Sequence, residues 1–109
     1  MKSSVFFMDD AVKQAYCALA LGKSEDCELG ALLDAAFDAI AGNVFCGVQV
    51  PKRLIPKTYR DTYGIDNLWK YNLSRSWRLL YSVASDGPEV VALIIEWLPH
   101  KEYERRFGY

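Results

Sequence analysis

The chain has 109 residues, is 51% apolar and 25% charged, and carries a formal net charge of −1. This length and balance are typical of one globular domain that can bury a core, so we expect a single domain over residues 1–109. No apolar run reaches the ~20 residues needed to span a membrane. The opening MKSSVFFMDD turns acidic too soon for a signal peptide. These features predict a cytoplasmic protein with no membrane partner.

Cys17, Cys27 and Cys46 are odd in number and lack the paired spacing of a zinc site. We therefore expect reduced, mostly buried thiols, and neither a metal nor a cofactor.

The charge is divided unevenly along the sequence. Residues 1–50 carry three Lys and seven acidic residues (3 − 7 = −4), whereas residues 51–109 carry ten Lys and Arg against seven acidic residues (10 − 7 = +3). The basic second half is suited to phosphate contacts, although the whole chain, with a pI near 5.8, is more acidic than a typical nucleic-acid binder.

The first half predicts a strand and a helical hairpin. Ser4–Met8 is a short apolar run, and Asp9 or Asp10 can cap a helix that ends at Gly22. A second helix, rich in Leu and Ala, follows from Ser24 to Gly42. Pro51 and Pro56 then rule out a long central strand or helix, which leaves a basic connecting segment with one short helical turn near Lys57–Tyr63.

The second half predicts three strands, Leu68–Leu73, Trp77–Val83 and Glu89–Leu98, separated by short turns and therefore antiparallel. Side-chain alternation places large apolar residues at odd positions, where we expect the helical hairpin to bury Trp69, Leu79, Leu93 and Trp97. The opposite face is expected to be an open polar patch that includes Lys70, Asn72, Arg78, Ser82 and Glu96. The fold class is thus α+β, with an N-terminal strand, a helical hairpin, a three-stranded antiparallel meander forming one sheet and a short C-terminal helical tail.

The ending PHKEYERRFGY follows the last strand directly and holds the only histidine, His100. Tyr103 lies three residues on and would share one side of a helical turn with His100. Because Tyr103 and Phe107 are four apart, a short amphipathic helical tail docked on the sheet is an equally good interpretation of the pattern.

Three segments carry a resemblance to a known family: NVFCGVQVPKRLIPKTY, DNLWKYNLSRSWRLLYSV and EWLPHKEYERRFGY. Together with the predicted element order they resemble the RelE/ParE superfamily of toxins from type II toxin–antitoxin pairs, and the archaeal RelE-like branch in particular. The similarity covers essentially the whole chain, and the closing HKEYE is its most specific part.

The resemblance implies a ribosome-dependent endoribonuclease that cuts messenger RNA and is held inactive by a cognate antitoxin. The family reaction is attack of a ribose 2′-OH on the neighbouring phosphodiester, without metal and without direct contact to DNA. It requires a base, an acid and positive charge on the phosphate.

The resemblance also implies roles for individual residues. Arg78 would hold the phosphate, and His100 and Tyr103 would act as the acid/base and base-stacking or proton-handling groups. Glu96 would act as a base or orient Arg78. The basic residues expected to contact RNA are Lys52, Arg53, Lys57, Arg60 and Lys70.

Two alternatives stay open. The ParE branch shares the fold but inhibits DNA gyrase, and the acidic pI leaves room for a catalytically inactive module that only binds its antitoxin.

Overall fold

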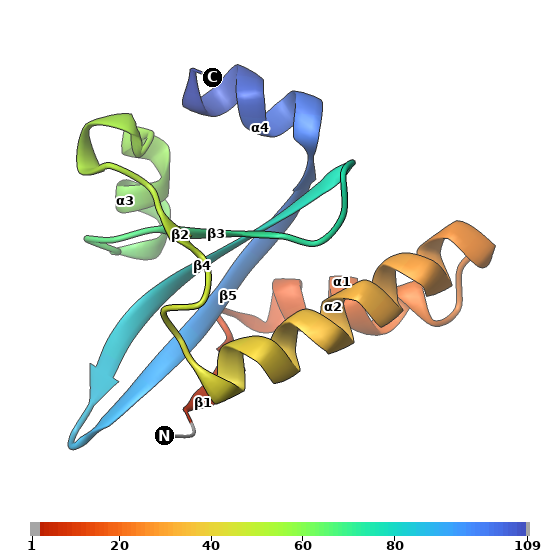
Figure 1. Cartoon of the computed structure of the whole chain (residues 1–109), viewed down its shortest axis with the longest axis horizontal. Helices are drawn as coiled ribbons and strands as arrows, with labels where there is room; N and C mark the ends of the chain where they lie inside the picture. The colour runs from red at the N-terminus through yellow and green to blue at the C-terminus, as the bar shows by residue number, and fades with distance from the viewer. Residues whose placement is uncertain (1–2, 109) are drawn as a thin grey trace.

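A computed structural model of the chain describes residues 3–108. In chain order the elements are β1 (Ser4–Phe7), α1 (Asp10–Leu19), α2 (Ser24–Gly42), β2 (Val48–Gln49), the 3₁₀ helix η1 (Lys52–Leu54), α3 (Lys57–Tyr63), β3 (Trp69–Asn72), β4 (Trp77–Asp86), β5 (Glu89–Pro99) and α4 (His100–Phe107). The predicted α+β class is confirmed. Figure 1 shows α1 and α2 on one side of the sheet and α3 and α4 on the other.

The sheet has five strands in the order β1-β5-β4-β3-β2. The strands β3, β4 and β5 form the antiparallel meander expected from the sequence, but two features differ from that prediction. β1 pairs parallel to β5, and the long connection that parallel strands require contains the α1–α2 hairpin and the elements from β2 to β4. β2 adds a second edge beside β3. Its two residues are too few for alternation to be visible in the sequence.

The helical hairpin begins as its sequence predicts. The Asp9 carboxylate accepts a hydrogen bond from the backbone N–H of Val12 at 3.0 Å and so caps α1. The two helices are then joined by a hydrogen bond from the Tyr16 hydroxyl to Asp34. This bond, together with burial, raises the pKa of Tyr16 to about 12.

The expectation of buried thiols is wrong, because all three cysteines are exposed. Cys17 and Cys27 belong to the two helices of the hairpin, and Cys46 lies in the loop before β2. Cysteine type alone does not predict which side of a helix or loop a residue occupies. These thiols therefore contribute little to the core.

A β-bulge changes which residues of β5 face the hairpin. Leu79 pairs with Trp97, but Tyr81 pairs with Ile94, so β5 has one residue more than β4 between these two pairs. One extra residue inverts the alternation of side chains beyond it. The even-numbered Ala92 and Ile94 therefore join the hairpin core, and the prediction that Leu93 lies there is wrong.

Of the four side chains expected to be buried on the hairpin face, only Leu79 is fully buried. Trp69 and Trp97 pack partly buried against the hairpin core, so their predicted face is right although their burial is incomplete.

The opposite face of the sheet is not an open polar patch, which corrects the second part of the alternation argument. Loop residues, α3 and α4 cover it with a second core. The fully or largely buried members of this core are Val50, Ile55, Tyr59, Ile65, Leu68, Leu80, Ile95, Leu98, Tyr103 and Phe107. The predicted helical turn near Lys57–Tyr63 is confirmed as α3, and it ends at Gly64, whose φ of +65° favours glycine.

No helix within residues 3–108 is long and apolar enough to cross a membrane.

Candidate functional site

The start of α4 and the β3–β4 turn form one corner of the molecule. The backbone N–H of His100 donates to the carbonyl of Ser76 at 2.7 Å, which fixes the first residue of α4 against the turn. On the adjoining strands, Arg78 pairs with Leu98, two residues before His100. The structure therefore places the backbones of the two sequence-predicted residues Arg78 and His100 in the same region, which we call the α4 corner.

Arg78 is only 9% exposed, unlike the open surface arginine that the sequence suggested. Its Nη1 donates to the backbone carbonyls of Ser74 at 2.7 Å and Trp77 at 3.1 Å, so part of its hydrogen-bonding capacity closes the β3–β4 turn. Its Nε is buried and has no hydrogen-bond partner among the described residues. A buried guanidinium N–H without an acceptor is costly, but a bound group could supply an oxygen to this atom only after the side chain moves, because the atom is buried.

The imidazole of His100 contacts a carboxylate on its own helix. Its Nε2 lies 2.7 Å from Oε1 of Glu104, one turn further along α4, and the two side chains are 41% and 42% exposed. Its Nδ1 is buried and makes no hydrogen bond within the described part of the chain. A carboxylate on one ring nitrogen fixes the imidazole tautomer and leaves the other nitrogen as an acceptor.

Tyr103 is not displayed for contact with RNA bases. It is 2% exposed, and its ring stacks on that of Phe107 with centroids 4.5 Å apart. The Nζ of Lys70 lies 5.2 Å from the centre of the Tyr103 ring, a cation–π contact. The docked-tail interpretation thus describes Tyr103 and Phe107, while His100 on the same helix stays accessible.

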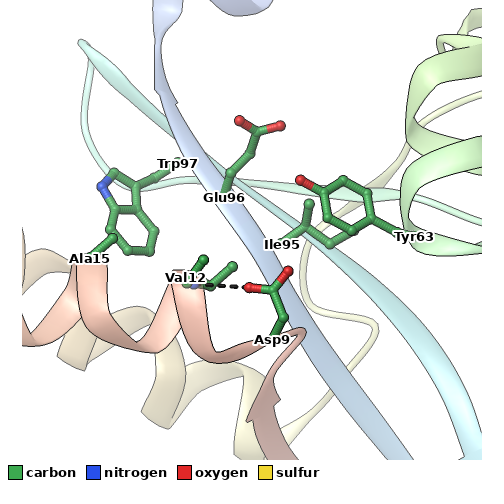
Figure 2. A pocket seen from close by; sticks show the side chains of 8 residues that line it. Asp9, Val12, Ala15, Tyr63, Ile95, Glu96 and Trp97 are labelled. Atoms are coloured by element: carbon green, nitrogen blue, oxygen red, sulfur yellow. Dashed lines mark hydrogen bonds between the residues drawn. The ribbon is translucent and has the colours of Figure 1, made fainter.

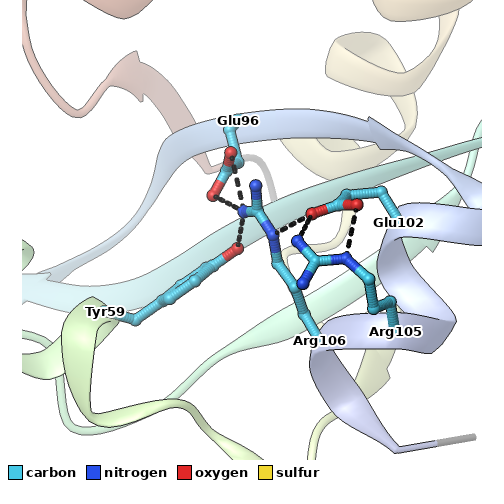
Figure 3. Close-up of polar contacts among 5 residues, drawn as sticks. All are labelled: Tyr59, Glu96, Glu102, Arg105 and Arg106. Atoms are coloured by element: carbon cyan, nitrogen blue, oxygen red, sulfur yellow. Dashed lines mark hydrogen bonds and ion pairs between the residues drawn. The ribbon is translucent and has the colours of Figure 1, made fainter.

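Glu96 contacts a different arginine from the one expected. Its carboxylate lies 3.4 Å from Nη1 of Arg106, which also donates to the Tyr59 hydroxyl at 2.9 Å. Arg106 Nε donates to Glu102 at 2.8 Å, and Glu102 in turn pairs with Arg105. Figure 3 shows this group, which we call the Arg106 network, connecting α3, β5 and α4.

The Arg106 network changes the acid–base properties of its members. Hydrogen bonds from Arg105 and Arg106 lower the pKa of the Glu102 carboxyl to about 2. Burial, followed by the nearby Glu96 carboxylate, raises the pKa of the Tyr59 hydroxyl well above its usual value. The network is therefore ionic at neutral pH with a protonated tyrosine, and it holds α4 on the sheet.

The predicted RNA-contacting residues of the connecting segment are exposed on η1 and α3: Lys52, Arg53, Lys57 and Arg60. Arg60 donates to the backbone carbonyl of Lys52 at 2.7 Å, which ties the two elements together. These elements share the second core with α4, as the 5.8 Å separation of the Tyr59 and Phe107 rings shows. We call the exposed cations of η1, α3 and α4 the basic face.

Sequence reasoning missed Glu104, Glu102, Arg106 and Tyr59. The i,i+4 spacing of His100 with Glu104, and of Glu102 with Arg106, was a usable signal once the tail was assigned as a helix. Tyr59 had no such signal, because it meets Arg106 across 47 residues of sequence.

No family model, curated protein or solved structure matches the chain.

Proposed function

We propose that this chain is the toxin of a type II toxin–antitoxin pair with a RelE-like fold, and that it cuts messenger RNA on the ribosome without a metal ion. The observation that carries the proposal is the α4 corner, which holds on neighbouring backbone positions an arginine whose buried Nε lacks an acceptor and a histidine that contacts a carboxylate. The order of strand, helical hairpin and antiparallel meander supports the RelE-like assignment.

The proposed chemistry uses His100 and Arg78 directly. The Nδ1 of His100 is buried in the free chain, so the half-exposed imidazole has to turn when RNA binds before this atom accepts the proton of the ribose 2′-OH. Glu104 then stabilises the imidazolium as it forms. The 2′-oxygen then bonds to phosphorus while the bond to the 5′-oxygen breaks, and the leaving oxygen takes a proton from solvent, which yields a 2′,3′-cyclic phosphate and a 5′-OH end. Arg78 stabilises the charge on the crowded phosphate. Catalytic contacts that are incomplete in a free enzyme often form only when substrate binds.

Two residues change role relative to the sequence hypothesis. Tyr103 supports α4 from within the second core, because a 2% exposed ring cannot stack on a base without leaving it. Glu96 belongs to the Arg106 network and is a positioning residue for α4 rather than the base.

The basic face supports binding of RNA beside this corner. The exposed cations of η1 and α3 lie on the same side of the sheet as α4, whereas the acidic residues of the first half lie mainly on the hairpin (Figure 1). Such a separation of charge orients the molecule toward phosphate-rich surfaces.

The test is messenger RNA cleavage in a reconstituted translation reaction, read by primer extension and by the chemistry of the new ends. We expect His100→Ala to lower the cleavage rate by ~10²–10⁴-fold with an unchanged melting temperature. Lys13→Ala, at an exposed position of α1 on the hairpin side, is the control and should cut at close to the wild-type rate. Equal cleavage by wild type and His100→Ala would contradict the assignment.

A second candidate is a module that binds its antitoxin but does not cut RNA. The saturation of Arg78 Nη1 by backbone carbonyls and the burial of Tyr103 favour it, since both residues then serve only the fold. This candidate predicts no cleavage by wild type, together with co-purification of the product of a neighbouring small gene.

A further inference from the structure

A pocket of about 320 Å³ opens beside β5, between the start of α1 and the end of α3, and Figure 2 shows it from close by. Its lining residues are Asp9, Ala11, Val12, Ala15, Tyr63, Ile95, Glu96 and Trp97. Neither Arg78 nor His100 lines it, so this pocket is separate from the α4 corner. Its volume lies near the lower end of the range for small-ligand sites.

The walls of the pocket combine three kinds of surface. Val12, Ala15 and Ile95 give it an apolar side. In Figure 2 the Trp97 indole and the Tyr63 ring stand on opposite sides of Glu96, and the Asp9 carboxylate lies below Tyr63. All the charged groups in the lining are carboxylates. The pocket is therefore apolar at its base, aromatic at its sides and negative at its rim.

The Asp9 and Glu96 carboxylates can each still accept a hydrogen bond from a ligand. Asp9 uses Oδ1 to accept from Val12. Glu96 contacts Arg106 only at 3.4 and 3.5 Å, longer than the ~2.7–2.9 Å of charge-assisted hydrogen bonds.

The charges around the pocket do not cancel. The Arg106 network contains two carboxylates, Glu96 and Glu102, and two guanidinium groups, and so sums to zero. Asp9 then leaves one net negative charge. Burial is the main cause that raises the pKa of Tyr63, the Glu96 and Asp9 carboxylates raise it further, and Arg106 lowers it. Both carboxylates are therefore within electrostatic range of the Tyr63 hydroxyl.

We propose that this pocket binds an alkylammonium or alkylguanidinium cation, with its apolar stem against Val12 and Ile95 and its charged head between Asp9 and Glu96. An anion would be repelled, and a neutral ligand would desolvate the carboxylates without compensation. A cation gains from both carboxylates and from the flanking aromatic rings, which attract positive charge over their faces. The same chemistry is offered by a Lys or Arg side chain of another polypeptide and by a small free amine.

The test is a titration of the ¹⁵N-labelled full chain followed through the indole N–H signal of Trp97, assigned with Trp97→Phe. The probes are n-butylguanidinium and n-butylammonium chloride, with 1-butanol as the uncharged control. We expect a saturable shift with both cations. We expect butanol to give none at equal concentration.

The key variant is Asp9→Asn, because asparagine caps a helix as well as aspartate does and only the charge is lost. It should weaken cation binding by about tenfold, the size expected for one hydrogen bond to a charged group. Asp10→Asn, the adjacent carboxylate outside the pocket lining, is the matched control and should bind as wild type does. Equal binding of butanol and the cations, equal binding by Asp9→Asn and wild type, or no saturable shift with either cation would each overturn the proposal.

A further titration distinguishes the two sources of the cation. Binding of N-acetylarginine amide with an affinity close to that of butylguanidinium supports a polypeptide side chain, because the pocket then accepts a backbone attached to the stem. Binding of the free cations alone supports a small amine. Both results support the site itself.

Discussion

The two faces of the sheet are built in different ways. The hairpin face is packed by long helices whose apolar residues recur at regular spacing, and its charged residues are mainly acidic and exposed. The opposite face is covered by short elements, η1, α3 and α4, and its core is bordered by the Arg106 network and the basic face. The hairpin face is thus held mainly by periodic packing, and the opposite face adds ionic contacts between segments far apart in sequence. We attribute function to the second face for this reason.

The largest expected loss of stability comes from substituting two adjacent residues of β4, which test whether both cores are tightly packed. Leu79 and Leu80 are both fully buried, but Leu79 faces the hairpin and Leu80 faces α3 and α4. Each Leu→Ala change should lower the free energy of unfolding by about 2–5 kcal/mol, because each leaves a cavity. Urea unfolding of the two variants gives the comparison. If Leu80→Ala costs much less than Leu79→Ala, the second core is looser than described.

A smaller effect is expected from the Arg106 network. Arg106→Met keeps much of the stem packing but removes the hydrogen bonds to Tyr59 and Glu102, and should cost about 1–2 kcal/mol at this partly exposed position. Faster amide exchange confined to α4 and α3 should accompany the loss. Arg105→Met is the matched control: its side chain is 71% exposed against 33% for Arg106, so it should alter stability less. The reverse order would show that the network does not hold α4.

The smallest expected effect is a dependence on pH through Glu102. Its pKa is lowered in the folded chain to about 2 from an ordinary value of 4.5, so its contribution to stability is present above about pH 4.5 and is lost as the pH falls toward 2. The difference in melting temperature between wild type and Glu102→Gln should therefore shrink as the pH is lowered through that range. A difference that stays constant would contradict the ionic contacts to Arg105 and Arg106.

The contrast between the faces also explains what the sequence predicted. The hairpin, the meander and the side of the sheet on which Trp97 lies were predictable from regular alternation and helix caps. Both are patterns among residues close together in sequence. The position of Leu93 was mispredicted because one bulge residue in β5 is invisible to alternation. Arg78 was expected on an open surface. The prediction failed because the helices that cover this face of the sheet are distant from Arg78 in sequence. His100 was identified as a candidate, but its partner Glu104 required the helical assignment of the tail.

We propose that the face carrying η1, α3 and α4, and not the hairpin face, meets the ribosome and its messenger RNA. Lysine acetylation footprinting of the chain with and without translating ribosomes tests it directly, because exposed lysines lie on both sides. Lys52, Lys57 and Lys101 report on the basic face, and Lys13 and Lys23 report on the hairpin. We predict protection of the first three with the hairpin lysines still reactive. Protection of Lys13 and Lys23 alone, or of none of the five, would contradict the account.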